Sequence, residues 1–408
     1  MEGINIPLIR AAFIIRQGLD EKPSWKSVRE TIQQIAAVQI DSISVVARSH
    51  HLTLRHRVRN YHPDQVWTAL RNNEVFEHFA HGCCFVPIEE YPYYRHRMER
   101  FSIHCNGWQK SRLIKYKKLM DAVEQRVRDE GPLSSKDFED PTATRRGGFW
   151  DWKPAKHALD LLWETGRLAV TERRGFQRYY DISERVIPSK YLDQHIDPEM
   201  VWRYFIERNL DSLVACTAKG LCEYISCSNF ALNISKNRTK TMEKQLEILI
   251  QEDIVTKITV PSVKNQYYML TRQLPFLERV QDRSNSSSTA WFLNPFDNIL
   301  WNRPRVKELF GIELKLEAYT PPSQRQFGYY VTPILWQHRV IGRLDPKANR
   351  ETSTLILRNF EVFLPSKEIP KVVEPIREEL HRFQTFHDLT TVKIEHATPS
   401  RLKSQFEG

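Results

Sequence analysis

Gln39 and Asp41 stand two positions apart in VQIDSISVVARSHHLTLRHRV, residues 38–58, with apolar Ile40 between them. In an extended segment, residues i and i+2 point to one side and residue i+1 points to the other. Ile40 can then anchor in a core, while the Gln39 amide and the Asp41 carboxylate share one exposed face. A carboxylate beside a polar amide, framed by cations, suits hydrolysis on a polyanion.

Basic and imidazole side chains follow this pair and supply the framing charge: Arg48, His50, His51, Arg55, His56 and Arg57. A solvated charge or a packed histidine is the alternative for each of them. Asp41 has an alternative too, because Asp is a preferred N-cap and a helix could begin near Ser42. The two interpretations of Asp41 are compatible, since a capping position also fixes a carboxylate rigidly.

Length and charge indicate what kind of protein positions these residues. The chain has 408 residues, enough for two to four domains, and a net charge of +10 from 60 basic and 50 acidic residues. This balance favours a polyanionic partner, with nucleic acid as the first candidate. The N-terminus does not resemble a signal peptide, and no apolar run approaches the length of a membrane span. We therefore expect a cytoplasmic protein, associated with the nucleoid if it is bacterial.

The six cysteines show neither a CxxC pair nor a zinc-ligand spacing with histidine: Cys83, Cys84, Cys105, Cys216, Cys222 and Cys227. This pattern predicts reduced thiols, no metal site and no cofactor. Nothing in the chain indicates an obligate dimer, so we expect a monomer.

A pattern of helix, strand, basic tip and strand occurs in residues 156–183 and again in 244–271. Each copy ends in a strand that contains Tyr-Tyr, and the order is that of the second half of a winged helix. The tips at 175–178 and 262–266 are the predicted wings. The N-terminal region is a less regular third copy. The sequence thus predicts three tandem winged helices, at 1–115, 116–195 and 196–283.

Basic residues cluster on these copies and are candidate DNA contacts: Arg48, Arg55 and Arg57 after the motif, Arg173, Arg174 and Arg178 around the second wing, and Lys236, Arg238 and Lys240 in the third recognition-like helix. His50 and His51 are weaker candidates for a DNA contact, with a packed histidine as the alternative. His81, which follows a predicted core strand in FAHGCC, is a site residue or a packed histidine. Trp150 and Trp152 are read as core or channel wall, with base stacking as the alternative.

The C-terminal part changes to period-two patterns after the polar break at 281–289. Strands are predicted at 314–320, 328–336, 339–345 and 353–363, followed by a helix at 369–387. We therefore expect a small β-rich domain at 290–398 with a closing helix. The whole chain is predicted to be an α+β protein.

Several stretches together carry a family resemblance: RQGL at 16–19, VQIDSISVVARSHHL at 38–52, FAHGCCFVPIEEYPYYRHRM at 79–98, WDWKPAKHALDLLWETGRLAV at 150–170, GFQRYYDISERVIP at 175–188 and the most specific one, LNPFDN through VTPIL at 293–335. The chain resembles the AlkZ/YcaQ family of winged-helix DNA glycosylases, which is associated with repair of DNA interstrand crosslinks. Gln39-Ile40-Asp41 matches the Gln-x-Asp form of the family's catalytic motif, as in the YcaQ-like branch. Ser323-Gln324 and Gln337-His338 depart from the charged residues expected there, which affects local contacts of the β domain and not the motif.

The resemblance implies three winged helices in a C shape, closed by the β-rich domain around a basic channel for duplex DNA. It also implies a substrate, a cationic N-alkylpurine such as N7-alkylguanine, whose departure needs no general acid. Asp41 then stabilises the oxocarbenium-like sugar and acts as general base, while Gln39 positions the water. No lysine lies nearby in sequence to form a Schiff base, which favours a monofunctional glycosylase over a lyase. The resemblance implies that the enzyme also unhooks interstrand crosslinks.

Two other functions compete with this one. A non-enzymatic DNA-binding protein, such as a transcriptional regulator, explains the basic charge and the winged helices. It does not explain an exposed carboxylate, which repels phosphate. A nuclease is disfavoured because the sequence has no carboxylate cluster spaced to hold a metal pair. A glycosylase leaves an abasic site without metal, a nuclease needs metal, and a pure binder leaves DNA unchanged.

Overall fold

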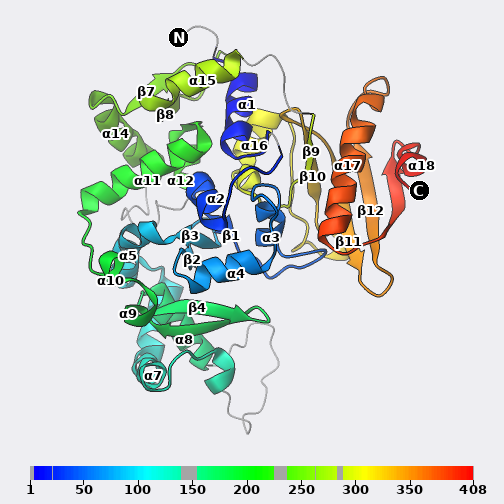
Figure 1. The fold of residues 1–408 in the computed structure, drawn as a ribbon. Coiled ribbons are helices and arrows are strands. Elements are labelled where there is room, and N and C mark those ends of the chain that lie inside the picture. The colour runs from blue at the N-terminus through cyan, green and yellow to red at the C-terminus, as the bar shows by residue number, and fades with distance from the viewer. Residues whose placement is uncertain are drawn as a thin grey trace. The chain divides into compact units, whose positions relative to one another are not determined.

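The computed structural model describes residues 4–20, 22–138, 154–224, 237–261, 263–282 and 288–407. Helices and strands are mixed along the chain (Figure 1), which separates into two compact units. Unit 1 comprises Met1–Tyr61, Leu210–Gly220 and Ile250–Gly408, and unit 2 comprises His62–Asn209 and Leu221–Leu249. The predicted division into four domains differs from these two units and stays a prediction. Trp150, Trp152 and Lys236 lie outside the described residues.

Unit 1 contains the N-terminal and C-terminal segments of the chain. Its helices are α1 (Ile6–Arg16), α2 (Val28–Ile35), α3 (Ser49–Leu54), α15 (Leu274–Gln281), α16 (Arg303–Phe310), α17 (Pro370–Phe386) and α18 (Leu402–Phe406). Its strands are β1 (Val38–Gln39), β6 (Ala215–Thr217), β7 (Val255–Ile258), β8 (Tyr267–Leu270), β9 (Ala290–Phe292), β10 (Thr332–Trp336), β11 (Arg339–Asn349), β12 (Thr354–Val362) and β13 (Thr391–Thr398).

The larger sheet of unit 1 has the order β13-β12-β11-β10-β9 among its described strands. Neighbouring strands are antiparallel except β12 and β13, which are parallel and joined through α17. A parallel pair needs such a crossover. Figure 1 shows α17 lying along this sheet. Val372, Ile376, Leu380 and Phe383 form one apolar stripe of α17 and share a core with the sheet.

The strands predicted at 328–336, 339–345 and 353–363 and the helix at 369–387 are confirmed by β10, β11, β12 and α17. The strand predicted at 314–320 is wrong, because this segment is a loop. Buried Glu317 accepts the backbone N–H groups of Gln326, Phe327 and Gly328 at 2.9, 2.8 and 2.9 Å. Burial opposes ionisation of the Glu317 carboxyl, but these three donors outweigh it and lower its pKa. Residues 314–320 therefore hold the loop at 326–328 through Glu317 and do not pair as a strand.

The N-terminal helix of unit 1 packs against two helices from the C-terminal half, α15 and α16, as Figure 1 also shows. The Arg305 guanidinium lies 4.1 Å from the centre of the Phe13 ring. It also donates to the carbonyl oxygens of Leu213 and Ala215 at 2.9 and 3.0 Å. One buried cation thus joins α1, α16 and the 210–220 segment.

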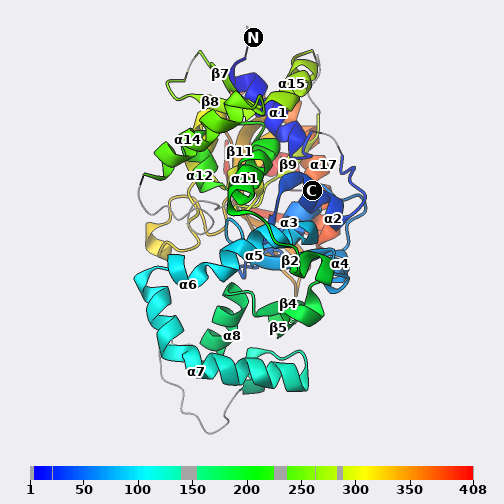
Figure 2. The same ribbon diagram turned by 90° about the vertical axis from the view of Figure 1, so that its left-hand side faces the viewer.

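Unit 2 contains the central part of the chain. Its helices are α4 (Asp64–Arg71), α5 (Tyr91–Glu99), α6 (Phe101–His104), α7 (Gly107–Glu130), α8 (Pro154–Glu164), α9 (Ser183–Val186) and α10 (Ser189–Leu192), and its strands are β2 (Val75–Phe79), β3 (Cys83–Pro87), β4 (Leu168–Arg174) and β5 (Gln177–Ile182). One unit boundary lies between Tyr61 and His62, and the other three fall within α11 (Pro198–Leu213), α12 (Ala218–Glu223) and α14 (Arg238–Gln251). α7 contacts both α8 and β5, and Figure 2 shows it alongside them.

The predicted order of helix, strand, tip and strand is confirmed at the level of these elements. Residues 156–183 form α8, β4 and β5, and residues 244–271 form α14, β7 and β8. The first tip is only the two-residue turn Gly175-Phe176, where φ is +54° and +72°. Positive φ at both positions gives a turn whose twist matches antiparallel strands, and glycine adopts it without strain. The first predicted wing is therefore a tight hairpin.

Candidate active site

The Gln39-Ile40-Asp41 segment has the alternating burial predicted from its sequence. Gln39 ends β1 and is half-buried, as is Asp41, whereas Ile40 is only 5% exposed. Ile40 therefore anchors the segment in the core of unit 1, and the amide and carboxylate both reach solvent.

The helix cap predicted for Asp41 is wrong. The next helix, α3, begins at Ser49 with Arg48 in the capping position. Asp41 instead accepts the backbone N–H of Ile43 with its Oδ1 at 2.8 Å, a turn that Asp side chains favour. The carboxylate is thus fixed by its own backbone while residues 42–48 make contacts elsewhere in unit 1.

On the N-terminal side, the motif is held by the side chain of buried Asn298. Its amide donates to the carbonyl oxygens of Ile35 and Ala37 at 2.9 and 2.8 Å. Ala36, between these two acceptors, has a φ of +78°, which costs a residue with a side chain free energy. The two hydrogen bonds hold this strained turn directly before the motif.

On the C-terminal side, the motif is held by the β-rich part of unit 1. The Val45 carbonyl accepts the N–H of Ala348 at 3.2 Å, and the Val46 carbonyl accepts the Arg350 guanidinium at 2.7 Å. Ile43, Val45 and Ala47 pack against the core beneath the sheet. Both ends of the motif are therefore fixed, as positioning of a reactive group requires.

The electrostatic setting of Asp41 suits a base. Burial raises the pKa of the Asp41 carboxyl, although the N–H groups of Ile43 and Ser42 and the charge of Arg48 oppose this shift. Arg48 itself donates to the Ser42 carbonyl at 2.9 Å. Among the described residues, no ion pair is formed by Asp41. Its charge is left to act on a ligand.

Two tyrosines near Asp41 were missed by sequence reasoning. Burial and the Asp41 charge raise the pKa of both Tyr319, which is 75% exposed, and Tyr330, which is 1% exposed. The buried Tyr330 hydroxyl has no hydrogen-bond partner among the described residues. No local pattern pairs Tyr330 with Asp41, because they are far apart in sequence and only the sheet brings them together.

The backbone of Tyr330 is held by the buried carboxylate of Asp345. Asp345 accepts the backbone N–H groups of Tyr329 and Tyr330 at 3.1 and 2.9 Å. A side chain at Gly328 would meet Asp345 Oδ2 at 2.2 Å, so only glycine allows this approach. The signal in the sequence was Asp345 itself, an acidic residue in a mainly apolar strand, which indicates a carboxylate that accepts hydrogen bonds inside the protein.

The arginines that follow the motif are not free to contact DNA. Arg57, 1% exposed, donates two hydrogen bonds of 2.9 Å to Asp297, and Arg55 and His56 both contact buried Glu379. A buried guanidinium paired with a carboxylate cannot reach a phosphate. The prediction of DNA contacts for Arg55 and Arg57 is therefore corrected: both stabilise unit 1.

The histidines after the motif are packed. His50 is fully buried, and its ring centre lies 4.1 Å from that of His51. His51 Nδ1 lies 2.9 Å from the Tyr61 hydroxyl. The predicted DNA contact of His50 is therefore wrong, because its side chain is buried. Arg48 and His51 are half-buried and keep some exposed surface.

In unit 2, the predicted wing arginines are mostly buried in an ion-pair network. Glu77 accepts Arg173 Nε at 2.7 Å and also contacts Arg178, and the side chains of these arginines are 5% and 18% exposed. Only Arg174, paired with Glu172 at 2.6 Å, is well exposed. The predicted DNA contacts of Arg173 and Arg178 are corrected, since the short turn brings both side chains back onto β2.

The remaining predicted site residues divide between surface and interior. Arg238 and Lys240 are exposed on α14. His81 Nδ1 lies 2.9 Å from the Tyr224 carbonyl oxygen, which supports the packed-histidine alternative.

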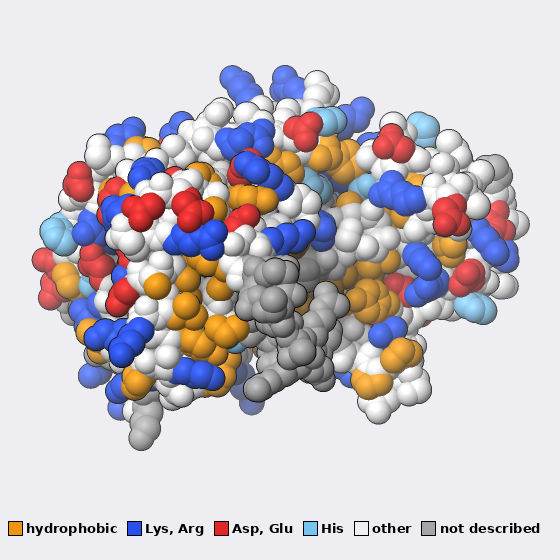
Figure 3. Space-filling view, turned by 90° about the horizontal axis from the view of Figure 1, so that it is seen from below, with side chains coloured by type: hydrophobic (Ala, Val, Ile, Leu, Met, Phe, Trp, Pro, Cys, Tyr) orange, Lys and Arg blue, Asp and Glu red, His pale blue; other side chains and the backbone are white. Residues whose placement is uncertain are grey.

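On the face drawn in Figure 3, Lys and Arg are interspersed with Asp and Glu and do not gather into one patch. The net positive charge therefore does not mark a single contact area on this face.

Within the described residues, no group of three His, Cys, Asp or Glu side chains is placed to hold a metal ion. In the same part of the chain, no helix is both long enough and apolar enough to cross a membrane.

Comparison with known proteins agrees with this arrangement. The family model described as DNA glycosylase AlkZ-like matches residues 32–386, which include the Gln39-Ile40-Asp41 motif and the elements that hold it. The solved structure of Streptomyces sahachiroi DNA glycosylase AlkZ is similar in fold, with a TM-score of 0.64 at 16% identity. The match covers 96% of this chain and 99% of that chain. The family match extends over most of the sequence, and the chain therefore belongs to the AlkZ-like DNA glycosylase family.

Proposed function

We propose that this protein is a monofunctional DNA glycosylase. It hydrolyses the N-glycosidic bond of cationic N-alkylpurines of the N7-alkylguanine type and unhooks interstrand crosslinks. One observation carries the proposal. Asp41 is fixed at both ends of its segment, has a raised pKa and forms no ion pair among the described residues. Family membership supports glycosylase activity.

The reaction follows from these side chains. A cationic purine leaves as a neutral base, so the enzyme has to stabilise the oxocarbenium-like sugar and supply water. Ionised Asp41 does the first by its charge, and its raised pKa makes it a better general base for the second. Gln39 orients the water with its amide. The Tyr330 hydroxyl, buried near Asp41, is a donor that can hold the same water.

Duplex DNA is the proposed partner of a monomeric, metal-independent and cytoplasmic enzyme. We assign the two helix–strand–strand copies and the less regular N-terminal region to three tandem winged helices, which the β-rich part of the chain follows. Phosphate contacts are assigned to the cations that keep exposed surface: Arg48, Arg174, Arg238 and Lys240.

The test is base release from duplex DNA that carries N7-methylguanine or an N7-linked interstrand crosslink, measured in EDTA. The native chain is compared with Asp41→Asn, Gln39→Ala and the exposed control Asp64→Asn. We expect release by the native chain and the control, and loss in Asp41→Asn with DNA binding retained. Tight duplex binding without release from either substrate would favour a regulator. Release that stops in EDTA would favour metal-dependent chemistry.

A further inference from the structure

Unit 2 carries a basic surface on the first half of α7. Residues 100–120 contain no Asp or Glu. Four lysines in this stretch are exposed: Lys110, Lys115, Lys117 and Lys118. Within the part of the chain that the structure describes, none of these lysines forms an ion pair. Exposed cations without neighbouring carboxylates attract an anionic partner.

The fold of unit 2 does not account for this charge. In the second half of α7, where acidic residues return, Asp121 pairs with Arg167 at 2.9 Å. In the first half, the lysines crowd like charges onto one helix, with Lys115 and Lys118 three residues apart. Like charges that are neighbours on a helix surface oppose its formation. The arrangement therefore costs the folded chain free energy that a partner of opposite charge would offset.

Large apolar side chains are exposed beside these lysines. Ile103 of α6, Trp108 and Ile114 are 67%, 64% and 72% exposed, and Figure 2 shows α6 leading into the N-terminal end of α7. Single exposed apolar residues are ordinary, but a group of them marks an interaction site. Ile114 shares a face of α7 with the lysines three and four residues away. We define the α7 surface as Trp108, Lys110, Ile114, Lys115, Lys117 and Lys118.

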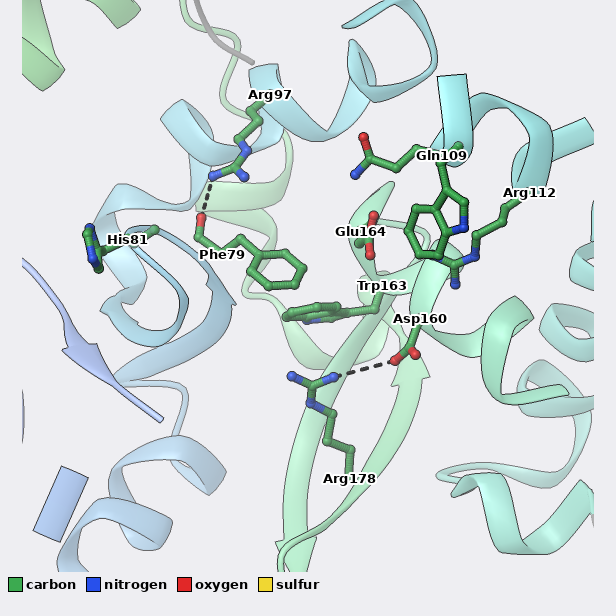
Figure 4. Close-up of a pocket in the computed structure, with 11 residues that line it drawn as sticks. Phe79, His81, Arg97, Gln109, Arg112, Asp160, Trp163, Glu164 and Arg178 are labelled. Atoms are coloured by element: carbon green, nitrogen blue, oxygen red, sulfur yellow. Dashed lines mark hydrogen bonds and ion pairs between the residues drawn. The ribbon is translucent and has the colours of Figure 1, made fainter. Parts of the chain in front are cut away.

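Trp108 also lines a pocket of about 550 Å³ that the proposed chemistry of Asp41 does not use. The ring centres of Phe79 and Trp163 lie 4.9 Å apart, and Figure 4 shows both bordering the same space. The Arg112 guanidinium lies 4.5 Å from the centre of the Trp108 ring and holds this indole at the edge of the pocket. The volume lies in the range of ligand sites, roughly 300–1,000 Å³. Three aromatic rings thus line a space that suits a large apolar side chain.

The arginines that line the pocket are already engaged by the protein. Arg178 contacts Asp160 at 3.5 Å, and Arg97 donates to the Phe79 carbonyl oxygen, as Figure 4 shows. Arg112 stacks on its neighbouring indole. The pocket therefore holds no guanidinium that lacks a contact among the described residues.

Glu164 is the remaining charged group of the lining. Burial raises the pKa of its carboxyl to about 7, although the charge of Arg112 lowers it, so the group is close to half protonated at neutral pH. A charged ligand thus meets no strong unmatched charge of the opposite sign in the pocket. An uncharged side chain is favoured there, and charged groups are favoured on the lysines outside.

We propose that the α7 surface and this pocket bind an acidic segment of another protein. A large apolar side chain of the segment enters the pocket against Trp108 and Trp163, and its carboxylates meet the lysines of the α7 surface. An apolar centre with a charged rim is the composition of a protein–protein interface. Duplex DNA would use the lysines alone, since Ile114 and a pocket of matched charges offer nothing to a phosphate.

The test measures binding of a fluorescein-labelled peptide to the full chain by fluorescence anisotropy. The probe is a short run of Asp and Glu that ends in two phenylalanines, made in both orders. We expect binding that falls roughly tenfold or more when alanines replace the phenylalanines. Trp108→Ala should weaken it by the same factor, because central aromatic anchors dominate interfaces. The double change Lys117→Glu and Lys118→Glu should weaken it roughly tenfold, because two attractions become repulsions.

Met200→Ala and Lys190→Glu, at exposed residues of unit 2 outside the α7 surface, are the matched controls and should bind like the native chain. Absence of binding of both probes to the native chain would overturn the proposal, as would equal affinity of Trp108→Ala and Met200→Ala. Weaker binding of undamaged duplex DNA by the lysine variant, with peptide binding intact, would overturn it in favour of DNA. A native dimer that Trp108→Ala converts to a monomer in sedimentation would overturn it in favour of a second copy of this chain.

Discussion

Asp41 in unit 1 and Glu77 in unit 2 are carboxylates in opposite electrostatic settings. Asp41 is half-buried, is bonded to its own backbone and forms no ion pair among the described residues. Glu77 is 3% exposed and contacts both Arg173 and Arg178. Burial raises the pKa of Asp41, whereas for Glu77 the two arginines overcome burial and lower the pKa to about 2. A carboxylate neutralised by the protein holds the fold, and one that is not can act on a cationic ligand.

The same contrast applies to the cations around the motif. Asp297 and Glu379 are fully buried and bind Arg57 and Arg55, so two of the arginines next to the motif in sequence serve the core of unit 1. They fix the end of the helix that follows the motif. Proximity in sequence therefore does not identify the cations that meet DNA.

Removing the charge of Asp41 should produce the largest effect. Asp41→Asn keeps the shape and the Ile43 hydrogen bond but loses the charge and the base. We expect base release from N7-methylguanine DNA to fall by roughly 10²–10⁴-fold, measured under single-turnover conditions. The apparent free energy of unfolding should stay close to that of the native chain. Full activity in this variant would remove Asp41 from the chemistry.

Removing the charge of Glu77 should instead destabilise the fold. Glu77→Gln leaves Arg173 buried without its carboxylate and Arg178 with only the 3.5 Å contact to Asp160, and breaking such a buried pair costs about 3–5 kcal/mol. Denaturant unfolding measures this loss. Glu172→Gln, which breaks the exposed pair with Arg174, is the control and should cost under about 1 kcal/mol. Equal losses in the two variants would show that the Glu77 network is not a buried support.

Acid should weaken the native chain through Glu77. Its pKa is about 2 in the folded state against an ordinary 4.5, so its stabilisation is complete above about pH 4.5. It is lost as pH falls from about 4.5 to about 2, and for a shift of this size it amounts to about 3 kcal/mol. The unfolding free energy of Glu77→Gln should therefore depend less steeply on pH across this range. Parallel curves for the two proteins would contradict the assignment.

Tyr330→Phe should have a smaller effect, confined to activity. The hydroxyl lacks a hydrogen-bond partner among the described residues, so its removal should leave stability unchanged or slightly higher. If it holds the reacting water near Asp41, base release should fall roughly tenfold, about the free energy of one hydrogen bond. A loss of stability together with activity would indicate a packing role instead.

Local patterns predicted what depends on neighbours in sequence. Alternation around Ile40 gave the buried anchor of the motif, and period-two segments gave β10 to β12. Partners far along the chain decided the rest. Arg57 looked like a surface cation because its partner Asp297 is 240 residues away. The helix predicted to begin near Ser42 does not form, and the carbonyl oxygens of Val45 and Val46 instead accept hydrogen bonds from Ala348 and Arg350. None of these partners can be inferred from residues 38–58 alone.

The smallest predicted effect concerns Arg174, the wing arginine that remains exposed. If it meets a phosphate, Arg174→Ala should weaken binding to any duplex by the same factor and lower the slope of log affinity against log salt by about 1. Stability should hardly change, because its pair with Glu172 is exposed. Lys240→Ala, on exposed α14, tests the third copy in the same way. A salt slope that neither variant changes would place both cations outside the DNA contact, and electrostatic steering would then have to come from other exposed residues.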